Sequence, residues 1–296
     1  MKQRNTIYIL VTVFILLIGG WVVFNIFYNS RRDNGKFNTK TETSHDVSVV
    51  YVNAGRADSI LVQLDGHSFL IDTGLKSSVT TIKEVLNKYK VGCLDAVFLT
   101  HQHSDHIGGL KKIAKDYEIS KIYEAQLSIR DYKGKNEIDK VAEKLEIPIE
   151  QLKFENQVKL VDDVFFEVLG PIQLNLKDDN DNSLVLRMHV NGRTFIFSGD
   201  MQFAEEQTLM DNNVDVAADV YKISNHGNPD ATLESFAKKV SPSYTIVTTD
   251  TQKDKDSANK RVLSFFKKSK IYLTQDYELG VLVTVNPLGK IKVEEA

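Results

Sequence analysis

The chain has 296 residues, of which 42% are hydrophobic and 26% are charged, so its composition is that of a globular protein and excludes a collagen, a coiled-coil rod or a wholly disordered chain. Lys plus Arg total 37 and Asp plus Glu total 40, and the net charge of -3 argues against a protein that holds nucleic acid by bulk charge. The single cysteine, Cys93, excludes an intramolecular disulfide and a cysteine-based zinc finger.

The N-terminal residues predict a membrane anchor. From Ile7 to Phe24 the side chains are apolar or small, and the uncharged stretch continues to Ser30. About 20 such residues are enough to cross a bilayer as a helix. No small-residue cleavage site follows, so a signal anchor over residues 1–30 is favoured over a cleaved signal peptide. We expect a single-pass protein of the cell membrane with an extracellular catalytic domain, joined by a polar, flexible tether over residues 31–46.

Residues 47–296 predict one α/β domain. Strand patterns cover residues 47–54, 59–64, 68–71, 94–100, 121–124, 164–168, 184–190, 194–198, 220–224, 244–249, 271–273, 280–285 and 290–293. Helical patterns cover residues 78–89, 109–117, 137–145, 203–210, 233–239 and 258–267. Hairpins followed by strand–helix alternation occur twice. This order predicts two halves packed sheet against sheet with helices outside, a four-layer αββα sandwich.

A histidine-rich segment follows the apolar strand predicted at 94–100. Three of the seven histidines of the chain, His101, His103 and His106, lie there with Asp105 among them. Imidazole nitrogens and carboxylate oxygens suit Zn²⁺ or a similar divalent ion. His101 and His103 can bind one ion from one side of a loop. Asp105 and His106, next along the turn, can reach a second. A solvated loop or a helix cap would not require three histidines at a buried strand end.

Two later strand ends supply further candidates. Asp200 follows the apolar run Phe195–Phe197 and is placed to bridge two ions, and His226 follows the run Tyr221–Ile223 and is placed to complete the second ion. The predicted metal ligands are His101, His103, Asp105, His106, Asp200 and His226, and the predicted catalytic residues are Asp105, His106 and Asp200.

The pattern His-x-His-x-Asp-His at 101–106, with Asp200 and His226, resembles the metallo-β-lactamase superfamily. One branch is especially similar, the C-terminal domain of the competence protein ComEC and its stand-alone relatives. The segments that carry this resemblance are 53–60, 70–74, 94–101, 182–187, 198–200 and 222–227. The resemblance implies the αββα fold already predicted from the order of the elements.

The chain departs from this branch at several positions. The branch usually reads Gly-Gln-Gly-Asp where residues 55–58 read Gly-Arg-Ala-Asp, and its usual His-His-Gly begins here with Asn225. The third histidine ligand of many superfamily hydrolases is also missing, and Asn182 lies in that region. The resemblance implies that Asp58 and Asp72 support the ligands, with Asn182 and Asn225 as further candidates for that role. We expect one or two divalent ions, Zn²⁺ or Mn²⁺.

These residues predict a metal-dependent hydrolase. Two divalent ions can lower the pKa of water to about 7 and withdraw charge from a phosphoryl or carbonyl oxygen. The branch resemblance favours phosphodiester bonds, in a small molecule, in DNA or in another phosphate-containing polymer, without stable nucleic-acid binding. Two alternatives remain: hydrolysis of a lactam, lactone or thioester, and a catalytically degenerate binding module, which the altered motifs at residues 55–58 and Asn225 would support.

Overall fold

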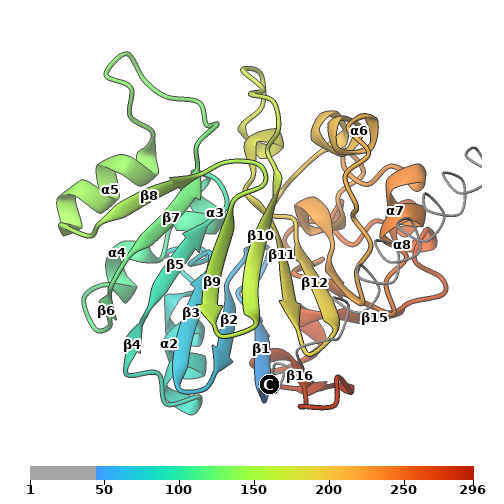
Figure 1. The fold of residues 1–296 in the computed structure, drawn as a ribbon, viewed down its shortest axis with the longest axis horizontal. Helices are drawn as coiled ribbons and strands as arrows, with labels where there is room; N and C mark the ends of the chain where they lie inside the picture. Colours follow the sequence, from blue (N-terminus) through green and yellow to red (C-terminus); the bar gives the residue numbers. More distant parts are fainter. Residues whose placement is uncertain (1–44) are drawn as a thin grey trace, which may run out of the picture. The chain divides into compact units, whose positions relative to one another are not determined.

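The computed structural model describes residues 45–296, and within them two β-sheets face each other (Figure 1). The strands of the first sheet, in spatial order, are β17 (Ile291–Glu295), β16 (Gly280–Val285), β1 (Val47–Val52), β2 (Ile60–Leu64), β3 (His67–Ile71), β5 (Ala96–Leu99), β7 (Ile122–Ala125) and β8 (Ile149–Leu152). The strands of the second are β15 (Lys270–Leu273), β14 (Tyr244–Val247), β13 (Val220–Lys222), β12 (Arg193–Phe197), β11 (Val185–Val190), β10 (Val164–Gly170) and β9 (Gln157–Val161). The short strands β4 (Cys93–Leu94) and β6 (Glu118–Ile119) pair separately.

Helices cover the outer face of each sheet (Figure 1). Those of the first half are α2 (Val79–Lys88), α3 (Ser104–Ile107), α4 (Leu110–Ile113) and α5 (Glu137–Leu145), and those of the second are α6 (Phe203–Asp211), α7 (Glu234–Val240) and α8 (Lys260–Ser264). Helix α5 begins with a capping box in which Asn136 and Asp139 exchange hydrogen bonds with each other's backbone N–H.

Three apolar clusters hold the layers together. The central cluster lies between the sheets, where Phe98 of one sheet packs edge-on against Phe166 of the other. A second cluster joins the first sheet to α2, α4 and α5, and a third joins the second sheet to α6, α7 and α8. Burying apolar side chains on both faces of each sheet is the driving force for this layering. The predicted αββα sandwich is therefore confirmed.

The N-terminal predictions have a different outcome. The anchor predicted over residues 1–30 and nearly all of the tether predicted over residues 31–46 lie outside the described residues. In the part of the chain that is described, no helix has the length and apolar character needed to cross a bilayer. The expected location as a single-pass protein of the cell membrane, with an extracellular domain, is corrected on this finding.

Two features of the topology were not predicted. The last hairpin, β16 with β17, returns to the first sheet and pairs with β1 rather than extending the second sheet. Strands β8 and β9 have no counterpart among the predicted strands, because their half-exposed residues do not form an apolar run. The helix predicted at 109–117 is confined to α4, and the short α3 precedes it.

Several strand ends that carry polar side chains meet at one edge of the sandwich. Strands β12, β13 and β14 run parallel, and β5 runs parallel to β3 and β7. The carboxyl ends of neighbouring parallel strands lie at the same edge of a sheet, which is where α/β folds place their sites. The segments that follow β5, β12 and β13 are those that hold the predicted ligands.

Candidate metal centre

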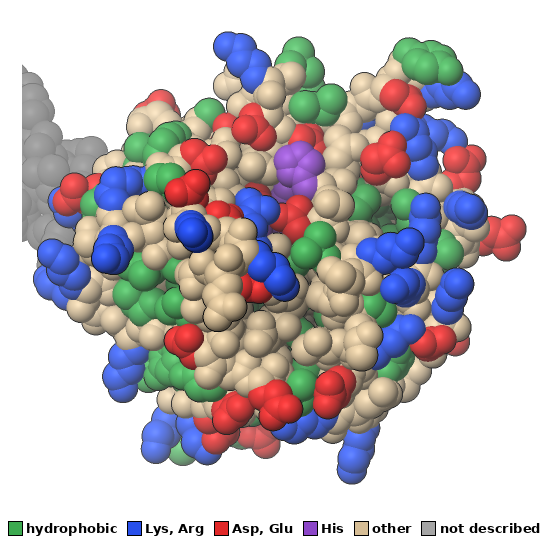
Figure 2. Space-filling model, turned by 180° about the vertical axis from the view of Figure 1, so that it is seen from behind, with side chains coloured by type: hydrophobic (Ala, Val, Ile, Leu, Met, Phe, Trp, Pro, Cys, Tyr) green, Lys and Arg blue, Asp and Glu red, His purple; other side chains and the backbone are tan. Residues whose placement is uncertain are grey.

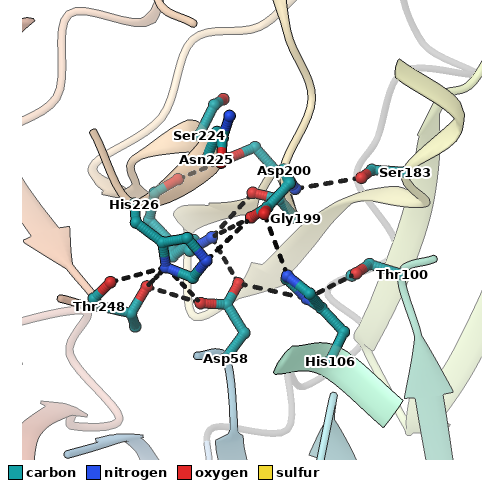
Figure 3. A network of polar contacts seen from close by, with 12 residues as sticks. Asp58, Thr100, His106, Ser183, Gly199, Asp200, Ser224, Asn225, His226 and Thr248 are labelled. Carbon is teal, nitrogen blue, oxygen red and sulfur yellow. Dashed lines mark hydrogen bonds and ion pairs between the residues drawn. The ribbon is translucent and has the colours of Figure 1, made fainter. Parts of the chain in front are cut away.

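Four of the predicted ligands come together between the two sheets. Asp105 and His106 lie on α3 after β5, Asp200 follows β12, and His226 lies in a 3-10 turn, η2 (Ser224–Gly227), after β13. Each offers one ligand atom within 4.8 Å of the other three. Figure 3 shows His106 and His226 pointing toward Asp200 from different sides. We call these four residues the ligand cluster.

Asp200 occupies the middle of the ligand cluster. Its Oδ2 lies 3.2 Å from Nε2 of His106, and its Oδ1 lies 3.4 Å from Nε2 of His226. The same Nε2 of His226 lies 3.6 Å from Oδ2 of Asp105. Each oxygen of Asp200 thus faces a different imidazole of the ligand cluster.

The outer nitrogens of both imidazoles have partners of their own. Nδ1 of His106 lies 2.7 Å from Oδ2 of Asp72, and Nδ1 of His226 lies 2.7 Å from the carbonyl oxygen of Thr248. Asp72 in turn accepts hydrogen bonds from the backbone N–H and the hydroxyl of Thr100, both at 2.8 Å. A proton on each Nδ1 satisfies these acceptors and leaves each neutral Nε2 with its lone pair toward the cluster, the usual support of a metal-ligating histidine.

Buried atoms of the ligand cluster lack hydrogen bonds. Nε2 of His106, Nε2 of His226 and Oδ1 of Asp200 have no hydrogen-bond partner in the described part of the chain. Leaving a buried polar atom unpaired costs about 1–3 kcal/mol. A divalent cation would satisfy all three, and two imidazoles with two carboxylates are a suitable donor set. The residues present therefore fit the divalent metal that the donor chemistry implies.

His101 and His103 form a separate pair beside the cluster. His101 is buried and His103 exposed, and Nε2 of His101 lies 3.0 Å from Nδ1 of His103. The ring of His101 packs on that of His106, with centroids 4.1 Å apart. Within residues 45–296, this pair belongs to no group of three or more ligand atoms as close as those of the ligand cluster. The structure therefore does not bring these two predicted ligands into the ligand cluster.

The charges of the ligand cluster support one another. Burial favours neutral His226, but the carboxylates of Asp200 and Asp105 outweigh it and raise the pKa of His226 to about 9. The pKa of His106 is likewise raised, against burial, by Asp200 and Asp72. Burial and the neighbouring imidazole of His106 lower the pKa of His101. A cation in the ligand cluster would therefore compete with protons for these imidazoles.

A buried lysine behind the ligand cluster was missed by the sequence analysis. Lys222 is fully buried, forms an ion pair with Asp58 and donates a hydrogen bond of 2.8 Å to the carbonyl oxygen of Gly199. Its Nζ also lies 3.8 Å from Oδ1 of Asp200. Asp58 accepts a further hydrogen bond of 2.6 Å from the hydroxyl of Thr248. The signal in the sequence was a single lysine inside an apolar run, Val220 to Ile223.

The backbone around the ligands adopts unusual conformations. Asn225 and His226 have left-handed φ values of 43° and 54°. Such values are uncommon outside glycine and cluster at functional sites. Gly199 also has positive φ, 52°, and a Cβ there would lie 2.9 Å from side-chain atoms of Ser183 and Thr100. Only glycine fits at this close approach, which directs the next residue, Asp200, into the cluster.

The predicted supporting residues divide into two groups. Asp72 contacts His106 directly, and Asp58 lies 3.7 Å from Nδ1 of His226. The polar contacts of the Asn182 side chain lie within its own loop, at Asn175 and Asp179. Asn225 donates to Asp230 and accepts a long contact of 3.4 Å from Arg56. In this structure, the two asparagines therefore make no direct contact with a predicted ligand.

Comparisons with known proteins agree with this geometry. The family model described as the metallo-β-lactamase superfamily matches residues 52–249. ComE operon protein 3 of Bacillus subtilis is 25% identical over 81% of this chain and 33% of its own length. Competence protein ComA of Neisseria gonorrhoeae is 28% identical over 68% of this chain and 27% of its own length. The chain therefore spans about a third or less of the length of these two relatives, and the predicted resemblance to ComEC-type proteins is confirmed.

A solved structure supports the fold in the same way. The metallo-β-lactamase fold protein YhfI from Bacillus subtilis covers 81% of this chain and 99% of its own, with a TM-score of 0.56 and 13% sequence identity. The family match and the donor set together imply a divalent cation. The chain belongs to the metallo-β-lactamase superfamily.

Proposed function

We propose that this chain hydrolyses phosphodiester bonds with one or two bound Zn²⁺ or Mn²⁺ ions. The observation that carries the hydrolytic part is the set of unpaired buried atoms in the ligand cluster, Nε2 of His106, Nε2 of His226 and Oδ1 of Asp200. The phosphodiester part rests on the resemblance to the ComEC-type branch, and the polar surroundings of the cluster are compatible with it.

The residues of the chain have distinct tasks in this proposal. Asp105, His106, Asp200 and His226 hold an ion, and His101 with His103 could hold a second beside Asp200. Bound divalent ions supply a low pKa for water and withdraw charge from a phosphoryl oxygen. Asp105, which is partly exposed at 13%, can accept a hydrogen bond from the attacking water. Asp72 and the Thr248 carbonyl keep the two imidazoles oriented.

We propose that the substrate is not held along an extended nucleic-acid track. Figure 2 shows basic and acidic side chains interspersed on one face of the molecule, with a histidine at the surface among them. The net charge of -3 agrees with this pattern. A protein that grips a long polyanion gathers its basic residues along one path. A small phosphodiester, or a single linkage of a polymer, fits the site better.

A substrate comparison tests the proposal. The full chain, treated with chelator and then supplied with Zn²⁺ or Mn²⁺, is assayed on bis-p-nitrophenyl phosphate, DNA and nitrocefin. We expect metal-dependent turnover of a phosphodiester. Turnover of nitrocefin alone would favour lactam hydrolysis. A protein that binds no metal and turns over none of these substrates would favour a binding module.

Two substitutions test the site itself. Asp105→Ala and His103→Ala should each lower phosphodiester turnover by at least about 100-fold. Mutating a residue that only orients a metal ligand already lowers activity by about 10–100-fold, and losing the ligand itself should cost at least as much. Circular dichroism and thermal unfolding should show that the fold is retained. A wild-type rate in Asp105→Ala would show that the ligand cluster is wrongly assigned, and a wild-type rate in His103→Ala would show that His103 holds no ion needed for turnover.

A further inference from the structure

A polar pocket adjoins the ligand cluster. It has a volume of about 510 Å³ and includes Asp105 in its wall. Small-molecule sites have volumes of about 300–1,000 Å³. Its wall contains four residues with hydroxyl groups, which are Ser77, Ser78, Thr81 and Ser104. It also contains four further charged residues, which are Arg56, Asp250, Lys253 and Asp254. Such a lining suits a polar, charged ligand.

Arg56 connects the ligand cluster to this pocket. Its Nη1 lies 2.8 Å from Oδ2 of Asp105. Its Nε lies 2.7 Å from Oδ2 of Asp254, which also lines the pocket, in an ion pair without hydrogen-bond geometry. Its Nη2 makes only a long contact, 3.4 Å, with Asn225. Its side chain is 33% exposed. The guanidinium is therefore fixed next to a predicted metal ligand while part of it stays open to solvent.

The guanidinium has binding capacity left over. It carries five N–H donors in a planar fork, and its hydrogen bonds to Asp105 and Asn225 use two of them, the second weakly. Guanidinium binds carboxylate and phosphate oxygens in the same way, often through two parallel hydrogen bonds. The carboxylate of Asp254 shows that an anion on the pocket side is accommodated.

We infer that Arg56 binds a negatively charged oxygen of the substrate's phosphoryl group, making the site selective for an anionic ester over a neutral one. The inference rests on the proposed function and adds the residue that recognises the substrate's charge. The substrate oxygen takes up free Nη donors of Arg56 and competes with the carboxylate of Asp254 for the positive charge of the guanidinium. The non-reacting part of the substrate occupies the pocket.

Steady-state kinetics on bis-p-nitrophenyl phosphate test the role of Arg56. Arg56→Gln should raise KM about 10–100-fold, because a hydrogen bond to a charged group of the substrate is lost. Arg56→Lys should restore part of the substrate affinity. Bound metal, measured by elemental analysis, should stay at the wild-type level. The matched control is Arg193→Gln, an ion-paired arginine at the start of β12, away from Asp200, and its KM should equal that of the wild type.

Asp254→Asn should change KM in the direction opposite to that of Arg56→Gln. It removes the competing anion but keeps an oxygen at Oδ1, which accepts from the backbone N–H of Asp256. We expect KM to fall and inhibition by inorganic phosphate to strengthen. An unchanged KM in Arg56→Gln, or an increased KM in Asp254→Asn like that of Arg56→Gln, would overturn the inference. Failure of the wild-type chain to hydrolyse any phosphodiester would instead overturn the proposed function.

Discussion

The ion pair between Lys222 and Asp58 is deeply buried behind the ligand cluster. Both side chains are at most 2% exposed, and each also contacts a neutral backbone or hydroxyl group. Removing one member of a buried pair leaves the other charge uncompensated, at a cost of about 3–5 kcal/mol. The pair therefore supports the ligand cluster from behind without being exposed to substrate.

Lys222→Met should lower the free energy of unfolding by about 3–5 kcal/mol, measured by urea denaturation. The double variant Asp58→Asn, Lys222→Met should lose less than the sum of the two single variants, because both remove the same interaction. The matched control is Lys238→Met, whose surface ion pair with Glu234 should contribute at most about 1 kcal/mol. Strict additivity of the buried pair would contradict this account.

Individual ligands could be predicted because their chemistry is visible locally. Three histidines and an aspartate at 101–106 need no tertiary information to suggest a metal. Arg56, Lys222 and Thr248 acquire their roles only through partners far away in the chain, such as Asp254 for Arg56 and Asp58 for the other two. A single sequence carries no signal for those pairings.

At the scale of elements, the turn after β12 controls where Asp200 lies. Gly199 has positive φ and touches Ser183 and Thr100, which come from other segments. Its carbonyl oxygen also accepts hydrogen bonds from Lys222 and from the backbone N–H of Asn225. One glycine thus fixes the relative positions of the segments after β5, β12 and β13.

Gly199→Ala should lower the free energy of unfolding by about 1–3 kcal/mol from overpacking, in addition to the left-handed penalty of about 1–2 kcal/mol. It should also reduce bound metal, because Asp200 would shift. Gly192→Ala is the matched control, since Gly192 has φ of 71° but open space around its Cβ position. It should show only the left-handed penalty and normal metal content. Equal effects of the two substitutions would show that the close approach is unimportant.

Most elements could be predicted from local pattern. The helix predicted at 137–145 matches α5, and the strand predicted at 280–285 matches β16. The pairing of β16 with β1 could not be predicted, since an alternating apolar pattern identifies the buried face of a strand but not its neighbours. The breadth of each sheet depends on such long-range pairings.

At the scale of the whole molecule, two buried glutamates make stability depend on pH. Burial raises the pKa of Glu206 from 4.5 to about 8, despite hydrogen bonds from the backbone N–H groups of Thr232 and Leu233. Burial likewise raises the pKa of Glu205 to about 8. Between pH 4.5 and about pH 8, the two glutamates of the folded chain keep protons that the same glutamates release in the unfolded chain. Stability should therefore fall as pH rises from about 4.5 to 8.

Glu206→Gln should reduce this decrease, because glutamine has no proton to lose. The free energy of unfolding, measured in urea at pH 5 and at pH 8, should change less in this variant than in the wild type. Glu234→Gln is the control, since Glu234 is an exposed glutamate on α7. It should retain the wild-type pH dependence. An identical pH profile for Glu206→Gln and the wild type would show that Glu206 is not responsible.

The two sheets contribute ligands jointly: Asp105 and His106 belong to the first half of the fold, and Asp200 and His226 to the second. A cation held by all four residues acts as a cross-link between two segments that lie far apart in the sequence. A free metal concentration of 100 times the dissociation constant would add about 2.7 kcal/mol to the free energy of unfolding. The melting temperature of the chain should therefore report the free metal concentration around it, independently of any substrate.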